Sequence, residues 1–345
     1  TWQSILNDGN VPSHPQYGSG PSPVVPDLLN VPIPSGAAYE GASARVANNG
    51  KGTDWFDELF DPATQSNVSI TASGGSEQGR YHMSLRYTDA PGTMVYTGFE
   101  SVSTRLNSEF RIGDKITVGQ NLTAVFDKEN YSNAGGAVQN ASFSSPLVPL
   151  KDTNGNWAGT YANSARTGIA NNPVADLARG SDNYNKNLKV IGDVYLKYDI
   201  TPKLKFTSNA GISFRDLDGR YFTKLNPEHG EAISVNDLYE NTFTINEWKV
   251  SNTLNFRDSF GDHTLDVLVG TEAVKNNYKG FGIKRTDYLF EDPGFYQLGN
   301  GAGTPVVNNS GESSWSLFSL FATANWSYGG KYFATATVRQ DDTSR

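Results

Sequence analysis

The stretch VSITASGGSEQGRYHMSLRYTDAPGTM, residues 68–94, decides the fold. Two segments in which apolar and polar residues alternate flank a Gly-Gly-Ser turn, and this alternation predicts a β-hairpin. One face of the second segment carries Tyr81, Met83, Leu85 and Tyr87, and the other carries Arg80, His82, Ser84 and Arg86. A soluble sandwich would bury the apolar face, whereas a membrane barrel would turn it toward lipid.

The composition of the 345-residue chain is compatible with a membrane β-barrel. Charged residues make up 19%, and the mean hydropathy of −0.49 is polar, yet aromatic residues reach 12% and glycines number 35. Barrel strands are apolar only at alternate positions, which produces this mixture. The net charge of −8 argues against nucleic acid as a partner. The lack of cysteine excludes a disulfide framework and a zinc–thiolate site.

The first part of the chain has a different character from the rest. TWQSILNDGN, residues 1–10, lacks the basic start and apolar core of a signal peptide, which leaves either a cytoplasmic chain or a missing amino end. No apolar run in the chain approaches the roughly 18 residues of a transmembrane helix. Residues 11–36 contain seven prolines, so we expect no regular element there. Such a segment is either a disordered linker or a long loop packed on the rest.

Alternating segments continue to the end of the chain and predict ten strands. They lie near residues 68–72, 81–87, 102–112, 116–126, 188–200, 204–214, 243–258, 263–278, 313–328 and 331–340, with an ambiguous phase between Trp315 and Trp326. Short turns alternate with long connections at 90–98, 129–186, 216–242 and 279–312. Outer-membrane barrels show this alternation of short periplasmic turns and long extracellular loops. We therefore predict an all-β fold, an antiparallel transmembrane β-barrel.

The period of two also predicts which side chains meet lipid. In the segment 188–200 we expect Val190, Val194 and Leu196 to face the acyl chains. Lys189, Asp193 and Lys197 then line a wet lumen, as does the Arg-His-Ser-Arg face of the first hairpin.

Several motifs resemble the SusC/RagA family of TonB-dependent outer-membrane transporters of Bacteroidetes. In chain order they are TDWFDELF (53–60), SGGSEQGRYHMSLRYTDAPGTM (73–94), TRLNSEF (104–110), NPVADL (172–177), DHTLDVLVGTEA (262–273) and GGKYFATATVRQDDTSR (329–345). The last departs from the family pattern, because Asp342-Thr343 stands where Gly-Ser is usual. The resemblance covers the chain from about residue 53 onward.

This resemblance implies a place in the cell outer membrane and a part of a roughly 22-stranded barrel. About ten of those strands would belong to this chain. Residues 1–58 would form a long extracellular loop region and residues 59–345 a partial barrel, with the plug domain and the carboxy-terminal half absent.

The resemblance also implies a function and partners. The function is import of a glycan or peptide across the outer membrane. A SusD-like surface lipoprotein would deliver the substrate, and the TonB complex would act through the missing plug. A non-transporting surface-binding protein or adhesin is the alternative, and a passive porin is another. The sequence does not identify the substrate.

The motifs of enzymes and cofactor sites are incomplete in this chain. GGSEQG misses the Gly-x-Ser-x-Gly pattern of a hydrolase, and GFGIKR (280–285) lacks the third glycine of a dinucleotide site. DTNGNW (152–157) has Trp157 where a calcium loop needs glycine, so a plain turn is favoured. The four histidines are far apart. We predict no catalytic residue, no metal site and no cofactor.

What remains is ligand binding in the connection 129–186. It holds Tyr131, Trp157, Tyr161 and Tyr184 among many asparagines, glycines and serines. Aromatic faces beside amide and hydroxyl groups suit sugar rings and also suit peptides. These four residues are the candidate ligand-binding residues, and packing within the loop is the alternative for each of them.

Overall fold

The computed structural model describes residues 2–14, 18–24, 28–30, 45–47, 52–130, 132–160 and 170–345. Its main element is one ten-stranded antiparallel sheet in which the strands follow one another in chain order from β5 to β14. The strands are β5 (Ser66–Gly75), β6 (Gly79–Pro91), β7 (Gly98–Ile112), β8 (Ile116–Asn130), β9 (Tyr184–Thr201), β10 (Leu204–Thr223), β11 (Asp237–Phe260), β12 (His263–Thr286), β13 (Val306–Tyr328) and β14 (Tyr332–Thr343). The prediction of ten antiparallel strands is confirmed.

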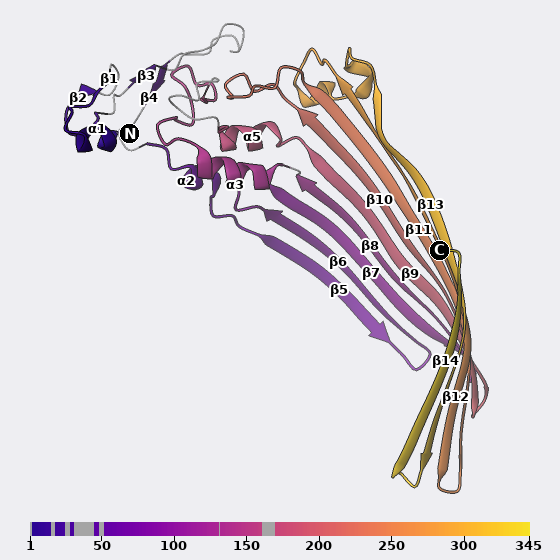
Figure 1. Cartoon of the computed structure of the whole chain (residues 1–345). Coiled ribbons are helices and arrows are strands. Elements are labelled where there is room, and N and C mark those ends of the chain that lie inside the picture. Colours follow the sequence, from indigo (N-terminus) through magenta and orange to yellow (C-terminus); the bar gives the residue numbers. More distant parts are fainter. Residues whose placement is uncertain are drawn as a thin grey trace.

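The sheet has two unlike ends, which we call the turn end and the loop end (Figure 1). Tight turns at 76–78, 113–115, 202–203, 261–262 and 329–331 form the turn end. Gly113 and Gly261 have φ of +62° and +58° there, a conformation that glycine adopts without steric cost. Connections at 92–97, 131–183, 224–236 and 287–305 form the loop end.

The connections at the loop end are shorter than predicted because several strands run on. The alternation of apolar and polar residues stops near Phe214 on β10, yet the ladder with β11 continues to Thr223. Backbone hydrogen bonds do not require apolar side chains, so a strand can extend where its hydrophobic pattern has ended.

The hydrogen-bonded register is regular across the sheet. It shifts only at Leu204/Lys205, beside a turn, and at Gly282/Ile283, near the loop end of β12. Because successive side chains of a strand point to opposite faces, a regular register keeps each set of side chains on one face across all ten strands.

Short elements occur within the proline-rich segment 11–36 and on either side of it. They are α1 (Trp2–Asn7), β1 (Ser13–His14), β2 (Gly18–Ser19), β3 (Leu28–Asn30) and β4 (Arg45–Ala47). β1 pairs with β2, and β3 pairs with β4. The prediction that residues 11–36 hold no regular element is therefore wrong. Pro12 directly precedes β1 and lacks the N–H donor that a longer ladder would need at this end of the pair.

Helices gather at the loop end (Figure 1). They are α2 (Trp55–Leu59), α3 (Ala134–Phe143) and α5 (Pro173–Arg179), with single 3-10 turns at η1 (Pro293–Phe295) and η2 (Leu298–Asn300). Two buried clusters lie here. The first contains Trp55, Leu59, Ala137, Ala141, Val148, Ala158, Val174 and Leu177, and the second contains Phe222, Leu238, Tyr288 and Tyr296. In the ranges that the structure describes, no helix is long and apolar enough to cross a membrane.

Candidate functional site: a two-faced sheet with a cap of loops

One face of the sheet is apolar on all ten strands, and we call it the apolar face. The register continues the Tyr81–Tyr87 set through aligned residues of each neighbouring strand. Its members include Val68 and Ile70 on β5, Val102, Leu106 and Phe110 on β7, Val118, Leu122 and Phe126 on β8, Leu188, Val194 and Leu196 on β9, Phe206 and Ile212 on β10, Trp248 and Leu254 on β11, Val267 and Val269 on β12, Phe318 and Leu320 on β13, and Val338 on β14. Most of these side chains are exposed, for example Ile70 at 69% and Val194 at 59%. A continuous exposed apolar surface of this size is typical of contact with lipid or another protein.

The apolar face has the height of a bilayer core. On β9 it runs from Leu188 to Tyr198, beyond which Lys186 lies on the same face toward the loop end. These eleven residues span about 33 Å of strand, which corresponds to a band about 25 Å tall at the strand tilt of membrane barrels.

The edge of the band crosses the sheet obliquely. Leu188 on β9 shares a hydrogen-bonded row with Val68 on β5, and each is the last aliphatic residue of this face toward the loop end. On β14 the last is Val338, which lies in the row of Tyr198, ten residues further toward the turn end. The edge is level from β5 to β9, and the whole drift of about 33 Å along the strands occurs between β9 and β14. Averaged over the sheet's width of about 43 Å, it corresponds to a mean tilt of roughly 40°. Transmembrane barrels tilt their strands by about 35–45°.

Aromatic rings mark the turn end of the apolar face. Phe260 stacks on His263 with ring centroids 5.5 Å apart, and Tyr328 and Tyr332 stack at 6.4 Å. The Trp326 Nε1–H donates to His263 Nδ1 at 3.1 Å. Rings with an apolar body and a polar tip favour the boundary between acyl chains and water. These rings therefore form the arrangement of an interfacial aromatic girdle at this end of the apolar face.

The opposite face, which we call the polar face, carries charges that pair across strands. Glu109 binds Arg80 at 2.8 Å and Lys197 at 3.2 Å, and it accepts a hydrogen bond from the Tyr195 hydroxyl at 2.7 Å. A second group lies on β11 to β14, where Glu272 binds Lys249 at 2.9 Å and Arg339 at 3.3 Å. Such a face is suited to a hydrated interior and unsuited to lipid.

At the loop end, α2 packs on the described part of the connection 131–183, which an ion pair joins to the connection 224–236. We call this assembly the loop cap. The NPVADL motif lies within it. The Asn172 side chain caps α5 by accepting the Ala175 N–H at 3.0 Å. Its amide donates to the carbonyl oxygens of Leu150 and Ala158, at 3.0 and 2.9 Å. Pro173 occupies the first turn of the helix, where its missing N–H has no cost. The motif thus builds α5 and attaches it to the segment before it.

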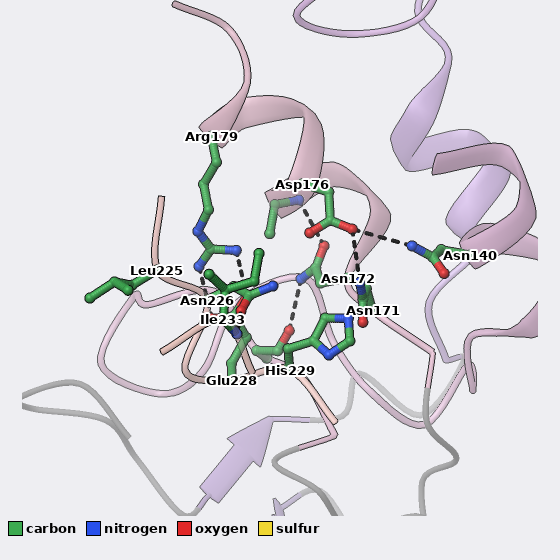
Figure 2. Close-up of polar contacts among 12 residues, drawn as sticks. Asn140, Asn171, Asn172, Asp176, Arg179, Leu225, Asn226, Glu228, His229 and Ile233 are labelled. Atoms are coloured by element: carbon green, nitrogen blue, oxygen red, sulfur yellow. Dashed lines mark hydrogen bonds and ion pairs between the residues drawn. The ribbon is translucent and has the colours of Figure 1, made fainter. Parts of the chain in front are cut away.

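A buried ion pair joins two connections of the loop cap (Figure 2). Arg179, at the end of α5, binds both carboxylate oxygens of Glu228 at 2.6 and 2.8 Å. The two side chains are only 14% and 1% exposed. Glu228 belongs to the β10–β11 connection, and its carbonyl oxygen lies so close to Gly159 that any side chain there would overlap it. The two connections are therefore held in close backbone contact.

Asp176, one turn before Arg179, is a carboxyl of the loop cap whose pKa is strongly affected by burial. Burial raises the pKa of its carboxyl from 3.8 to about 7, although the neighbouring Arg179 acts in the opposite direction. The amides of Asn140 and Asn171 donate to its Oδ2 at 3.2 and 3.3 Å (Figure 2). Asp176 is thus a carboxyl that exchanges its proton near neutral pH.

We expect the stability of the loop cap to change with pH between about pH 4 and 7. Asp176→Asn should remove most of this contribution. The folded-state pKa lies above the unfolded one, so the folded cap holds the proton more tightly, and the cap loses stability as the pH rises through this window. In the wild type, ionisation of Asp176 over this pH range lowers the stability of the loop cap by at most roughly 4 kcal/mol. Asparagine keeps the acceptor and cannot ionise. Amide hydrogen exchange of α5 in the full-length protein, corrected for intrinsic rates, measures the effect.

His229 provides the internal check on this prediction. Burial lowers the pKa of its imidazole, so its charging below neutral pH destabilises the cap and opposes the effect of Asp176. The Asp176→Asn protein should therefore become less protected as the pH falls, whereas the wild type should not. An unchanged pH profile in Asp176→Asn would contradict the assignment.

The structure places two of the four predicted ligand residues. Trp157 packs at the edge of the loop cap's core, with the Lys151 ammonium 2.9 Å from its ring centroid. Tyr184 starts β9, and its ring lies between Lys186 at 4.2 Å and Arg220 at 4.7 Å. Tyr131 and Tyr161 fall outside the described residues. Packing accounts for both described rings, so their role toward a ligand stays a prediction.

The sequence analysis did not single out Asp176 or the ion pair of Arg179 with Glu228. The NPVADL motif contains Asp176 and stops two residues before Arg179, so it was a usable signal for these two. Nothing local marks Glu228, which is 49 residues from its partner. The DTNGNW segment is a turn, since Asp152 Oδ1 accepts the N–H groups of Asn154 and Asn156 at 2.9 and 2.8 Å.

Comparison with known proteins gives consistent relatives. A TonB-dependent receptor of Formosa agariphila is 26% identical over 89% of this chain and 31% of its own length. The TonB-dependent receptor SusC of Bacteroides thetaiotaomicron is 24% identical over 85% of this chain and 30% of its own length. The solved structure of the RagAB peptide transporter matches with a TM-score of 0.69, at 20% identity over 85% of this chain and 33% of that one. No family model matches the chain.

These findings agree with the geometry. The chain spans about a third of the length of the curated relatives it matches. Its sheet has the exposed apolar band and the alternating short and long connections of an outer-membrane barrel. Over most of its length the chain is similar to part of TonB-dependent receptors, SusC among them, and its sheet has the fold of a TonB-dependent outer-membrane β-barrel.

Proposed function

We propose that the chain forms part of the wall of an energised nutrient importer in the outer membrane. The apolar face contacts acyl chains, the polar face lines the hydrated path, and the loop cap lies at the cell exterior. The observation that carries this proposal is the oblique apolar band, which has the height and tilt of a bilayer-spanning wall. The similarity to TonB-dependent receptors supports energised import.

The finer parts of the proposal concern partners and substrate. A SusD-like surface lipoprotein delivers a glycan or a peptide to the loop cap, and the TonB complex acts through a plug domain that lies outside this chain. Residues 1–58 contribute to the external loop region and residues 59–345 to the barrel. The likeness to the RagAB peptide transporter supports the peptide alternative, and the likeness to SusC supports the same general arrangement.

Cysteine labelling of intact cells tests the orientation. We expect Ser142→Cys, exposed on α3 in the loop cap, to react with a membrane-impermeant maleimide. Gly261→Cys, in a tight turn at the other end, should react only after the cells are permeabilised. The chain has no cysteine of its own, so it adds no background. Labelling at Gly261→Cys alone in intact cells would reverse the orientation.

Deleting tonB in cells that take up the substrate separates the functional alternatives. An importer loses uptake in the deletion strain and keeps surface binding. A passive porin keeps its uptake. A surface-binding protein or adhesin binds ligand in both strains and imports it in neither.

A further inference from the structure

Two lysines lie just beyond the apolar band, on the same face of the sheet. Lys275 on β12 pairs in the register with Trp248, an exposed ring of the band on β11. Lys279 is four residues further toward the loop end of β12. Both side chains are exposed, and within the described ranges neither has an ion-pair or hydrogen-bond partner. They are thus accessible to a ligand that approaches from this side of the sheet.

The two lysines face the membrane and not the interior of the barrel. Successive side chains of a strand point to opposite faces, so Lys275 and Lys279 share the face of Val267 and Val269. A segment that fills the interior of a barrel contacts the polar face, on the other side of the wall. Such a segment does not provide partners for these two lysines.

The lysines lie at the depth of lipid headgroups. Asn277 is between them on the same face of β12. At a tilt of about 40°, Asn277 is about 5 Å further from the membrane centre than Lys275. The headgroup layer of one leaflet is about 5–7 Å thick. The two lysines are about 13 Å apart along the strand, so their long stems bring both ammonium groups toward an anion placed over Asn277.

Polar groups surround this position, and the balance of charge is positive. Asn277 pairs with Ser314 on β13, whose side chain is exposed. Glu312 pairs with Lys279 in the register, and the described residues show no ion pair between the two side chains. Two ammonium groups against one carboxylate leave a net positive charge. We call Lys275, Asn277, Lys279 and Ser314 the lysine site.

A groove in the apolar face lies on the membrane side of the lysine site, and we call it the lateral groove. It has a volume of about 550 Å³. Its mainly apolar lining includes Phe206, Leu254, Val269, Leu320, Ala322 and Val338. Thr271, also in the lining, is four residues before Lys275 on β12, and the residue between them on this face is the small Ala273. A hydrocarbon chain in the groove can therefore continue to a headgroup at the lysines.

We propose that the lysine site and the lateral groove together bind one phosphate-bearing lipid of the outer leaflet. The lipid phosphate lies over Asn277 and accepts hydrogen bonds from the Lys275 and Lys279 ammonium groups, and one acyl chain occupies the lateral groove. A soluble anion would use the lysines and leave the groove empty. The outer leaflet follows from the proposed orientation, in which the loop end lies at the cell exterior.

Lipid binding to the purified full-length protein in detergent tests the proposal. The probes are diphosphoryl lipid A and the same lipid A after enzymatic removal of its phosphates, and native mass spectrometry measures the bound fraction. We expect the wild type to bind the phosphorylated form at least tenfold more tightly, because a lysine near an anionic lipid contributes about fivefold. Lys275→Gln/Lys279→Gln should lose this preference. Inorganic phosphate in large molar excess should not displace the lipid.

Ala322→Leu tests the lateral groove. Leucine fills part of the groove and stays apolar toward lipid, so the folded fraction by heat-modifiable mobility should equal that of the wild type. We expect this variant to bind both forms of lipid A about fivefold more weakly or less tightly still, because overfilling a packed site costs free energy. Unchanged binding would mean that the groove holds no acyl chain, and this overturns the proposal.

Lys128→Gln/Lys186→Gln is the matched control for charge. Lys128 and Lys186 pair with each other on β8 and β9, at the loop-end edge of the apolar face. Glu100 and Asp218 flank them in the same row and balance their charge. We expect this variant to bind phosphorylated lipid A like the wild type. An equal loss in both double variants means that only net charge matters, and the proposal is then wrong.

Three further outcomes also contradict the proposal. The first is equal binding of both forms of lipid A by the wild type. The second is displacement of the lipid by inorganic phosphate, which would make the lysine site an anion site only. The third is a fall in the folded fraction of Lys275→Gln/Lys279→Gln, which would mean that the lysines hold another segment of protein. The labelling and tonB-deletion experiments are independent, so orientation and import can be established while the lipid site is refuted.

Discussion

Val194→Arg in the full-length receptor is expected to reduce the folded barrel in outer membranes strongly. Val194 lies near the middle of the apolar band on β9 and is 59% exposed on the apolar face. An arginine facing lipid near the midplane costs about 2–4 kcal/mol. Heat-modifiable electrophoretic mobility of isolated outer membranes measures the folded fraction directly.

Ile191→Arg is the matched control. Ile191 is also 59% exposed and lies on the same strand, three residues away, but on the polar face. Its arginine would point into the hydrated interior, so we expect the folded fraction of the wild type. This position is a better control than Asp193, which accepts hydrogen bonds from Asn121 and Asn209. If the two arginine variants fold equally well, the apolar face does not contact lipid.

Arg179→Met is expected to lower the free energy of local opening of the loop cap by about 3–5 kcal/mol. The change leaves the Glu228 carboxylate, 1% exposed, without its bidentate partner. Without its partner, the desolvation of a buried charge is no longer compensated by an ion pair. The local structure therefore opens so that water can hydrate the charge. Amide hydrogen exchange of α5 and of residues 224–236 reports this opening, while the sheet should remain protected.

Two further variants identify the cause. Arg179→Met/Glu228→Leu removes both charges, and we expect it to recover much of the lost protection, because an apolar pair of similar volume replaces a buried ion pair at little cost. Lys205→Met breaks an exposed pair with Asp199, whose side chains are 52% and 44% exposed, and should change protection by less than about 1 kcal/mol. If the double variant is as loose as Arg179→Met, packing and not the stranded charge is responsible.

The strands and tight turns of the ten-stranded sheet could be predicted from the sequence, because the pattern that indicates each of them lies within a few consecutive residues. The period of two is visible within each strand, and tight turns such as the one at Gly113 are readable from a few residues. The alternation was enough to predict that Tyr81 and Val194 lie on the apolar face of their strands. The strand ends beyond the band could not be predicted, since residues such as Asp216 and Asp218 pair through their backbones and leave no hydrophobic pattern.

The candidate site was predicted less well because its contacts are not local. Trp157 and Tyr184 were chosen for their aromatic rings, and in the structure both rings pack against neighbouring cations. The contact between Arg179 and Glu228 depends on two connections meeting in space, and no spacing within one segment predicts it.

The close fit of Gly159 against Glu228, with Arg179 clamped on the same residue, limits how this receptor could be re-engineered. A chimaera that takes the β8–β9 connection from a homologue would bring in a surface shaped for another neighbour, and a swap of the β10–β11 connection alone would do the same. The two connections form one exchangeable module. A library designed to change the receptor's ligand should therefore recombine them as a pair, with each crossover placed inside the strands that carry them.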